Sequence, residues 1–181
     1  PKTGAPLLHV WEDFQCPACK LVEDANGAGI EELGVSGSAQ LIYRPTGFLD
    51  ADLAKDNAAN GNPNSSHRAI AAWGCAIDAG KTAEYHNTIF ANQPTKEGTG
   101  FSTQQLLDFG TTAGISGDAF TTFSQCVNDQ KYLEWAVNAT QEMTTAGVTG
   151  TPKGFLAGQK LDNAVLADKA KLDEAVASAT K

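Results

Sequence analysis

The sequence predicts an α/β fold in which β-rich segments at the two ends of the chain enclose a long helical region. Residues 1–48 contain two β-rich runs separated by a helical pattern. Residues 49–147 show helical periodicity without a convincing strand, and residues 148–181 contain two short β-rich runs followed by a helix. We therefore expect three parts with these boundaries, in the order βαβ, an all-helical insertion, and ββα.

The first part begins with a run that is typical of a buried strand. Residues 7–14 carry apolar side chains on both faces. Pro17 then stands at the first position of a predicted helix, where proline is best tolerated, and we expect Gly34 to end that helix. Residues 40–44 form a second β-rich run, closed by Pro45. A strand, helix and strand in this order predict a right-handed unit with parallel strands.

The middle of the chain predicts a surface loop followed by a series of helices. Residues 50–64 are polar and contain an Asn-Gly-Asn-Pro turn cluster, which favours a loop. Ser65 or Ser66 is a suitable cap for the next helix, which reaches Gly80. Further helical patterns cover about 82–92, 102–113, 117–127 and 130–146.

The last part returns to strand patterns. Residues 154–157 and 159–161 can pair as a hairpin around Gly158. Residues 165–179 have one apolar face and one charged face, which predicts a closing helix with a solvated side.

Composition excludes several classes of function. The chain has 181 residues, a net charge of −8 and an isoelectric point near 4.7, and it lacks the basic cluster that a nucleic-acid partner requires. No apolar run reaches the roughly 18 to 20 residues of a membrane span. The chain begins at Pro1 without an initiator methionine, so we expect a mature form whose targeting segment has been removed.

Two cysteines stand where a strand gives way to a helix. Cys16 and Cys19 enclose Pro17-Ala18 at the predicted start of the helix. Unpaired backbone N–H groups and the helix dipole stabilise a thiolate there, so the pKa of the first cysteine should fall. The second cysteine lies one turn further on the same face and can close a disulfide. We expect Cys16 to be the exposed sulfur that partners attack and Cys19 to be the more buried resolving sulfur.

A second candidate feature is Thr151-Pro152, which precedes the predicted hairpin. A cis peptide bond there would hold the backbone of Thr151 against the sulfur pair. An extended substrate segment could then pair with that backbone as an added strand.

The CPAC centre after its strand, the helical insertion and the Gly-Thr-Pro run together resemble the DsbA-like branch of the thioredoxin superfamily, over essentially the whole chain. With its second pair of cysteines, the chain is similar to the extracytoplasmic DsbA-like proteins of actinobacteria. The resemblance implies a thioredoxin fold, and a low cysteine pKa is the known behaviour of DsbA itself. It implies a nucleophile and its partner at Cys16 and Cys19, redox tuning by Pro17 and Ala18, and substrate binding by Thr151 and Pro152.

The resemblance also implies a function. Such a protein introduces disulfides into unfolded or reduced exported proteins and is reoxidised by a membrane protein of the DsbB or VKOR type. It works outside the cytoplasm with a redox-active disulfide and no metal or organic cofactor. Two alternatives stay open, namely a disulfide reductase or isomerase, and a redox-inert binding or chaperone module.

Two positions depart from the family pattern. Ala18 stands where DsbA proteins have a histidine that stabilises the thiolate. Val10 stands where the superfamily has a buried acid, six residues before the first cysteine. Glu12 projects to the same strand face as Val10 and can replace that acid, or it can be a solvated residue at the end of the strand.

The remaining cysteines, Cys75 and Cys126, lie 51 positions apart in separate predicted helices. From the residues alone they are either a disulfide or two unrelated buried thiols. The resemblance to actinobacterial proteins favours the disulfide, which would place the protein outside the reducing cytosol. A zinc site would need a second short-spaced pair, and the sequence has none. The histidines show no spacing typical of a metal site, and we expect each to be structural or solvated; they are His9, His67 and His86.

Overall fold

The computed structural model describes residues 1–180 and contains a mixed sheet joined to a bundle of helices. The elements follow the chain as β1 (Leu7–Glu12), α1 (Pro17–Val35), β2 (Gln40–Pro45), α2 (Leu49–Asp52), α3 (Ala54–Ala59), α4 (Ser65–Asp78), α5 (Thr82–Ala91), α6 (Thr103–Thr112), α7 (Gly117–Asn128), α8 (Leu133–Thr145), β3 (Lys153–Leu156), β4 (Gln159–Leu161), α9 (Asn163–Leu166) and α10 (Lys169–Ala179). This is the thioredoxin fold with a large helical insertion, as the sequence predicts.

The sheet has four strands in the order β2-β1-β3-β4. Strand β1 pairs with β2 in parallel and with β3 antiparallel, so Leu8 lies between Leu41 and Leu156. The parallel pairing of β1 and β2 across α1 is the predicted βαβ unit. Strands β3 and β4 form the predicted hairpin, with Leu156 opposite Gln159.

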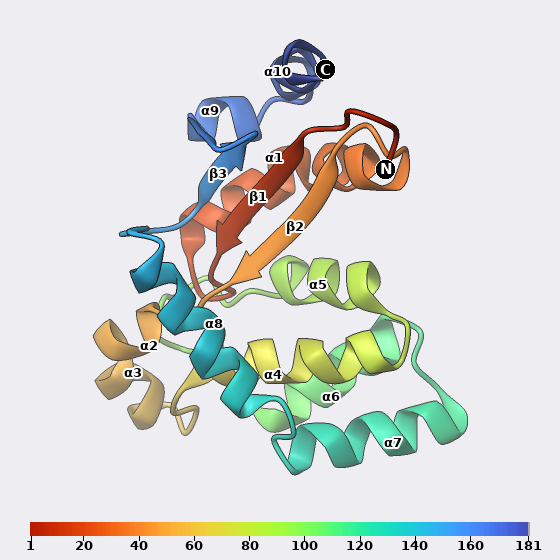
Figure 1. Cartoon of the computed structure of the whole chain (residues 1–181). Helices are drawn as coiled ribbons and strands as arrows, with labels where there is room; N and C mark the ends of the chain where they lie inside the picture. The colour runs from red at the N-terminus through yellow and green to blue at the C-terminus, as the bar shows by residue number, and fades with distance from the viewer. Residues whose placement is uncertain (181) are drawn as a thin grey trace.

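Apolar side chains on one face of the sheet pack against α1, α9 and α10. This core contains Leu8, Val10, Val22, Ile30, Leu33, Ala39, Leu156, Leu166, Leu172 and Val176. On the other face Trp11 packs with Met143 and Val148, at the end of α8. Figure 1 shows that β1 and β2 both point towards the helical insertion, with α4 to α7 gathered beyond the ends of these strands. The segment that leaves β1 therefore enters the boundary between the sheet and the insertion.

The insertion has a core of its own, and it includes the segment that follows β1. Phe14 is 1% exposed and contacts the rings of Trp73 and Phe90. Cys16 and Cys19 belong to the same buried cluster. The redox centre is thus packed against the insertion as well as against the sheet.

The expectation of a surface loop over residues 50–64 is wrong, because this stretch holds the short helices α2 and α3. Asp50 and Asn57 are buried there, at 6% and 0% exposure, and both bond to the side chain of Gln15. Polar composition therefore did not indicate exposure. These side chains face inward because another buried amide satisfies them.

Two helix boundaries also differ from expectation. Asn64, with φ of 51°, precedes α4, whereas Ser65 and Ser66 lie inside its first turn and are fully buried. The predicted closing helix is divided into α9 and α10. Asp168 caps the second of these, since its side chain accepts a hydrogen bond from the backbone N–H of Lys171 at 3.2 Å.

Candidate active site

Cys16 lies at the N-terminus of α1, as its position before Pro17 predicts. It is the N-cap residue, with φ of −74° and ψ of 116°, and its sulfur accepts the backbone N–H of Cys19 at 3.4 Å. Pro17 occupies the first turn, where its missing N–H leaves no helical bond unmade. The sulfur therefore takes the place that a serine or aspartate oxygen takes in an ordinary helix cap.

Both cysteines are thiols, and both are buried. Cys19 is 1% exposed and Cys16 is 6% exposed, so the expectation of an exposed Cys16 is wrong, although Cys16 is the more accessible of the two. The Cys16 sulfur lies under the loop that precedes β3, 3.5 Å from the carbonyl oxygen of Thr151, to which it donates when it is protonated. Pro17 and Ala18 are exposed beside it and leave one side open.

The two thiols have opposite pKa shifts. Hydrogen bonding from the Cys19 thiol lowers the pKa of Cys16 to about 6; the backbone N–H groups of Cys19 and Ala18 add to the shift, and burial opposes it. Burial raises the pKa of Cys19 well above 9.0, and hydrogen bonding to Cys16 and the charges of Cys16 and Glu12 raise it further. The surroundings of the centre thus favour the thiolate on Cys16 and the protonated thiol on Cys19.

Glu12 is buried and its charge acts on Cys19, so of the two alternatives for this position the solvated side chain is wrong. It is 2% exposed and is paired with His86 of α5, which is 1% exposed, through Oε1 and Nε2. Burial alone would lower the pKa of His86, but the Glu12 carboxylate outweighs it and raises the value to about 9. Val10, six residues before Cys16, packs instead in the apolar core under the sheet.

Glu23 of α1 completes this cluster. Burial raises its pKa to about 8, and the charge of Glu12 adds to the shift. Within residues 1–180, Glu12, Glu23 and His86 are the one group of three potential metal ligands whose donor atoms all lie within 4.8 Å of one another. Both ring nitrogens of His86 already have partners, since Nδ1 contacts the side chain of Asn87 at 3.1 Å. The arrangement is that of a hydrogen-bonded ion pair rather than of a free ligand set.

The turn before Cys16 is held by a second buried polar network. Asp13 accepts hydrogen bonds from Ser66 Oγ at 2.6 Å and from the backbone N–H of Gln15 at 2.9 Å. Burial raises the pKa of Asp13 to about 7, against these hydrogen bonds. The Gln15 amide nitrogen lies 2.8 to 3.1 Å from acceptors on Asp50, Asn57 and Ser66. The first helices of the insertion thus fix the backbone that leads into Cys16.

The loop before β3 brings Thr151 and Pro152 to the sulfur pair, 135 positions further along the chain than Cys16. The peptide bond between them is cis. Pro152 is buried, and Thr151 Oγ1 is buried without a hydrogen-bond partner among residues 1–180. These two residues and the CPAC segment therefore form one site.

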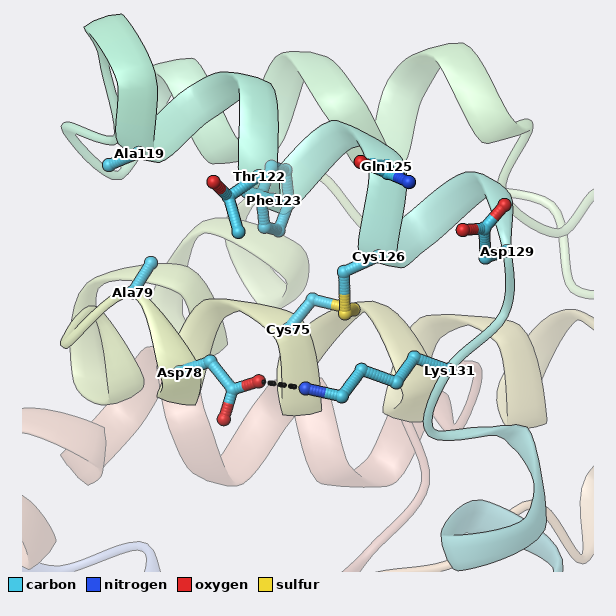
Figure 2. Close-up of a pocket in the computed structure, with 10 residues that line it drawn as sticks. All are labelled: Cys75, Asp78, Ala79, Ala119, Thr122, Phe123, Gln125, Cys126, Asp129 and Lys131. Atoms are coloured by element: carbon cyan, nitrogen blue, oxygen red, sulfur yellow. Dashed lines mark hydrogen bonds and ion pairs between the residues drawn. A yellow bond between two sulfur atoms is a disulfide. The ribbon is translucent and has the colours of Figure 1, made fainter.

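Cys75 and Cys126 form a disulfide, with Cα atoms 5.9 Å apart. Figure 2 shows the bond joining α4 to α7. Both cysteines line a pocket with a volume of about 530 Å³. The ion pair between Asp78 and Lys131, at 2.8 Å, crosses the same pocket. This bond lies in the insertion and is separate from the CPAC centre.

The fold and this site define the class of protein. Residues 2–175 match the family model described as Thioredoxin, so the chain belongs to the thioredoxin family.

Within that family the chain is similar to DsbA proteins. It superposes on oxidised DsbA from Mycobacterium tuberculosis with a TM-score of 0.69 and 25% identity, covering 97% of this chain and 90% of that chain. Its fold is also similar to MdbA, a thiol-disulfide oxidoreductase from Actinomyces oris, with a TM-score of 0.77, 20% identity and coverage of 99% and 83%. For MdbA from Corynebacterium diphtheriae the TM-score is 0.71 and the identity is 19%, covering 99% of this chain and 85% of that chain. No curated protein matches the chain.

Sequence reasoning missed several residues of this site. His86 was expected to be structural or solvated with no assigned partner, yet it pairs with Glu12, 74 positions earlier. The sequence pattern assigns no role to Asp13 or Gln15, which hold the turn before Cys16. Because Val10 stands where the superfamily has a buried acid, the sequence indicates Glu12 as its replacement. The sequence does not indicate that His86 is the partner of Glu12.

Proposed function

We propose that this protein is a thiol-disulfide oxidase that introduces disulfides into exported proteins through Cys16 and Cys19. The observation that carries the proposal is the Cys16 sulfur at the N-terminus of α1, with its pKa lowered to about 6. A thiolate that is stable at neutral pH favours the reduced form of the pair. The corresponding disulfide is therefore a strong oxidant.

The reaction would proceed through a mixed disulfide. A substrate thiolate attacks the Cys16 sulfur of the Cys16–Cys19 disulfide, a bond forms between substrate and Cys16, and Cys19 leaves as a thiolate. A second substrate thiolate then attacks the substrate sulfur of the mixed disulfide and releases Cys16 as a thiolate. The substrate loses two electrons, which remain on the reduced pair.

The raised pKa of Cys19 favours the forward direction of this reaction, from the protein disulfide to the substrate disulfide. Once released, the Cys19 sulfur takes up a proton, because burial and the charges of Cys16 and Glu12 disfavour its thiolate. A protonated Cys19 does not attack the mixed disulfide in return. Glu12 would thus affect the reduction potential of the pair through its charge, and Pro17 and Ala18 would affect it as the dipeptide between the two cysteines.

Substrate would dock on Thr151 and Pro152. The Thr151 carbonyl lies 3.5 Å from the Cys16 sulfur, and its side-chain hydroxyl lacks a partner among the described residues. An extended substrate segment could pair with this backbone and present a cysteine to Cys16.

The proposed setting follows from the same chemistry. The partners would be reduced or unfolded exported proteins, together with a membrane reoxidase of the DsbB or VKOR type that accepts the two electrons. The centre would need no metal or organic cofactor. The Cys75–Cys126 disulfide supports a location outside the reducing cytosol. No helix within residues 1–180 has the length and apolar character needed to cross a membrane.

The test is oxidative refolding of a reduced substrate protein by the wild type, Cys16→Ser and Cys19→Ser. Cys16→Ser should be inactive, because the sulfur that is attacked is absent. Cys19→Ser lacks the disulfide that the substrate attacks and should also be inactive, but with oxidised glutathione supplied as the oxidant it should accumulate a mixed disulfide through Cys16. Undiminished refolding activity in Cys16→Ser would end the proposal.

A reductase or isomerase is the second candidate, and Ala18 is the observation that favours it. Ala18 is exposed beside Cys16 and adds no charge to stabilise the thiolate. The reduction potential separates the two functions. A value near about −120 mV, that of DsbA, would support the oxidase; one near about −180 mV, that of protein disulfide isomerase, would favour the isomerase, and one near about −270 mV, that of thioredoxin, would favour the reductase.

A further inference from the structure

The turn between β1 and α1 leaves a backbone carbonyl that neither element satisfies. The backbone N–H of Cys16 donates to Asp13 at 2.9 Å and closes the turn. Phe14, inside the turn, is 1% exposed, and its carbonyl receives no backbone N–H from residues 1–180. A buried carbonyl of this kind needs a side-chain donor.

That donor is Gln93, which lies just after α5. Its amide nitrogen donates to the Phe14 carbonyl at 2.8 Å and to the Cys16 carbonyl at 3.1 Å. The residue is 9% exposed, so these hydrogen bonds have little competition from water. The Cys16 carbonyl also accepts the N–H of Lys20 at 3.2 Å, which places it at the base of α1.

The side-chain amide of Gln93 therefore joins the carbonyl oxygens of Phe14 and Cys16, which lie at the two ends of the segment that leads into the helix. The direction of the Cys16 sulfur depends on the φ and ψ angles of the cap, and those angles depend on where the Cys16 carbonyl is held. Gln15, between the two carbonyls, is anchored separately through its side chain to Asp50 and Ser66. Gln93 is the contact that acts on the backbone itself.

We propose that Gln93 is a positioning residue of the redox centre, whose amide holds the cap conformation that aims the Cys16 sulfur at the helix N-terminus. The insertion would then set the reactivity of a cysteine that belongs to the thioredoxin fold. This inference rests on the proposed thiol-disulfide chemistry of Cys16. Gln93 would then contribute to that chemistry although it lies 77 positions after Cys16 in the chain.

The test compares Gln93→Asn, Gln93→Met and Gln93→Glu with the wild type. Asparagine keeps the donor but is shorter, methionine keeps the length without a donor, and glutamate offers only acceptors and a charge. The readouts are the pKa of Cys16, from the ultraviolet absorbance of its thiolate in the reduced protein, and the equilibrium constant with glutathione. Matched controls are Gln104→Met and Gln104→Glu, at an exposed position of α6.

We expect the pKa of Cys16 to rise in the order Gln, Asn, Met, Glu. A rise of about one unit in Gln93→Met would lower the thiolate fraction at pH 6 from one half to about one tenth. The oxidising equilibrium constant should fall by a similar factor, while both Gln104 variants should match the wild type.

Two results would overturn the inference. If the Gln93 variants lose stability but keep the wild-type pKa and equilibrium constant, the amide only satisfies buried carbonyls and does not position the sulfur. If the wild-type Cys16 itself titrates at an ordinary thiol value, the proposed function fails and the inference fails with it.

Discussion

Two chemically identical side chains, Cys16 and Cys19, acquire opposite properties within one turn of α1. Cys16 caps the helix, where N–H groups stabilise its thiolate, whereas Cys19 is buried further along and faces the charge of Glu12. The difference comes from position alone. It gives the pair one sulfur, Cys16, whose thiolate is stabilised, and one, Cys19, that is held protonated.

The pH dependence of alkylation tests this difference directly. In the reduced protein the rate at which iodoacetamide modifies Cys16 should reach half its maximum at about pH 6, because the thiolate is the reactive form. Peptide mass spectrometry identifies the modified residue. Reaction at Cys19 should lag at every pH up to 9. A half-maximum for Cys16 near its usual value of 9.0 would contradict the assigned geometry.

At the scale of elements, β1 and α5 are joined by the buried pair of Glu12 and His86. The pair connects the last residue of a strand in the thioredoxin fold with a helix of the insertion. The buried ion pair holds α5 against the end of β1. Because the charge of Glu12 also raises the pKa of Cys19, the same pair affects the redox centre.

Replacing Glu12 by glutamine should separate these contributions. Without the carboxylate, burial dominates and the pKa of His86 should fall from about 9 to its ordinary 6.5 or below. A raised histidine pKa stabilises the folded state fully below pH 6.5, and this contribution is lost as the pH rises through about 9. The free energy of unfolding should therefore drop by about 3 kcal/mol at pH 6 and by less at pH 9.

NMR titration of the His86 ring and denaturant unfolding at the two pH values provide the measurements. Glu174→Gln, at an exposed position of α10, is the matched control. An unchanged His86 titration in Glu12→Gln would show that the pair does not set its charge.

The periodicity of the sequence predicted most elements but not the contacts between them. Strand and helix patterns located β1, α1, β2 and the hairpin, because these patterns record which faces are buried. The same patterns could not show that Asp50 and Asn57 face inward, since their burial depends on Gln15. They also could not pair Glu12 with His86 or Gln93 with Phe14, because such contacts form only when distant segments meet.

At the scale of the whole molecule, the Cys75–Cys126 disulfide ties together two helices of the insertion, α4 and α7. In Figure 1, α7 lies on the side of the bundle away from the sheet, and α4 lies between α7 and the sheet. The bond therefore stabilises the bundle against which the redox centre packs, without taking part in the site.

Removing this bond should lower stability and leave the chemistry in place. Cys75→Ala with Cys126→Ala opens a loop of 51 residues, which should cost roughly 4 kcal/mol of unfolding free energy in the chain-entropy model. Thermal unfolding of the oxidised protein measures this loss. At temperatures where the variant stays folded, the pKa of Cys16 should equal that of the wild type. A changed pKa would show that the bond acts on the redox centre.

The pairing of β1 with β3 determines when the Thr151 loop can reach the Cys16 sulfur during folding. Leu8 pairs with Leu156, so the loop holding Thr151 reaches Cys16 only after the intervening chain has been synthesised. Closing so long a loop costs little more free energy than closing a shorter one, but non-local strand pairing is slow. An emerging chain thus carries Cys16 before Thr151 can lie beside it. The contact that completes the surroundings of Cys16 is therefore among the last that the growing chain can form.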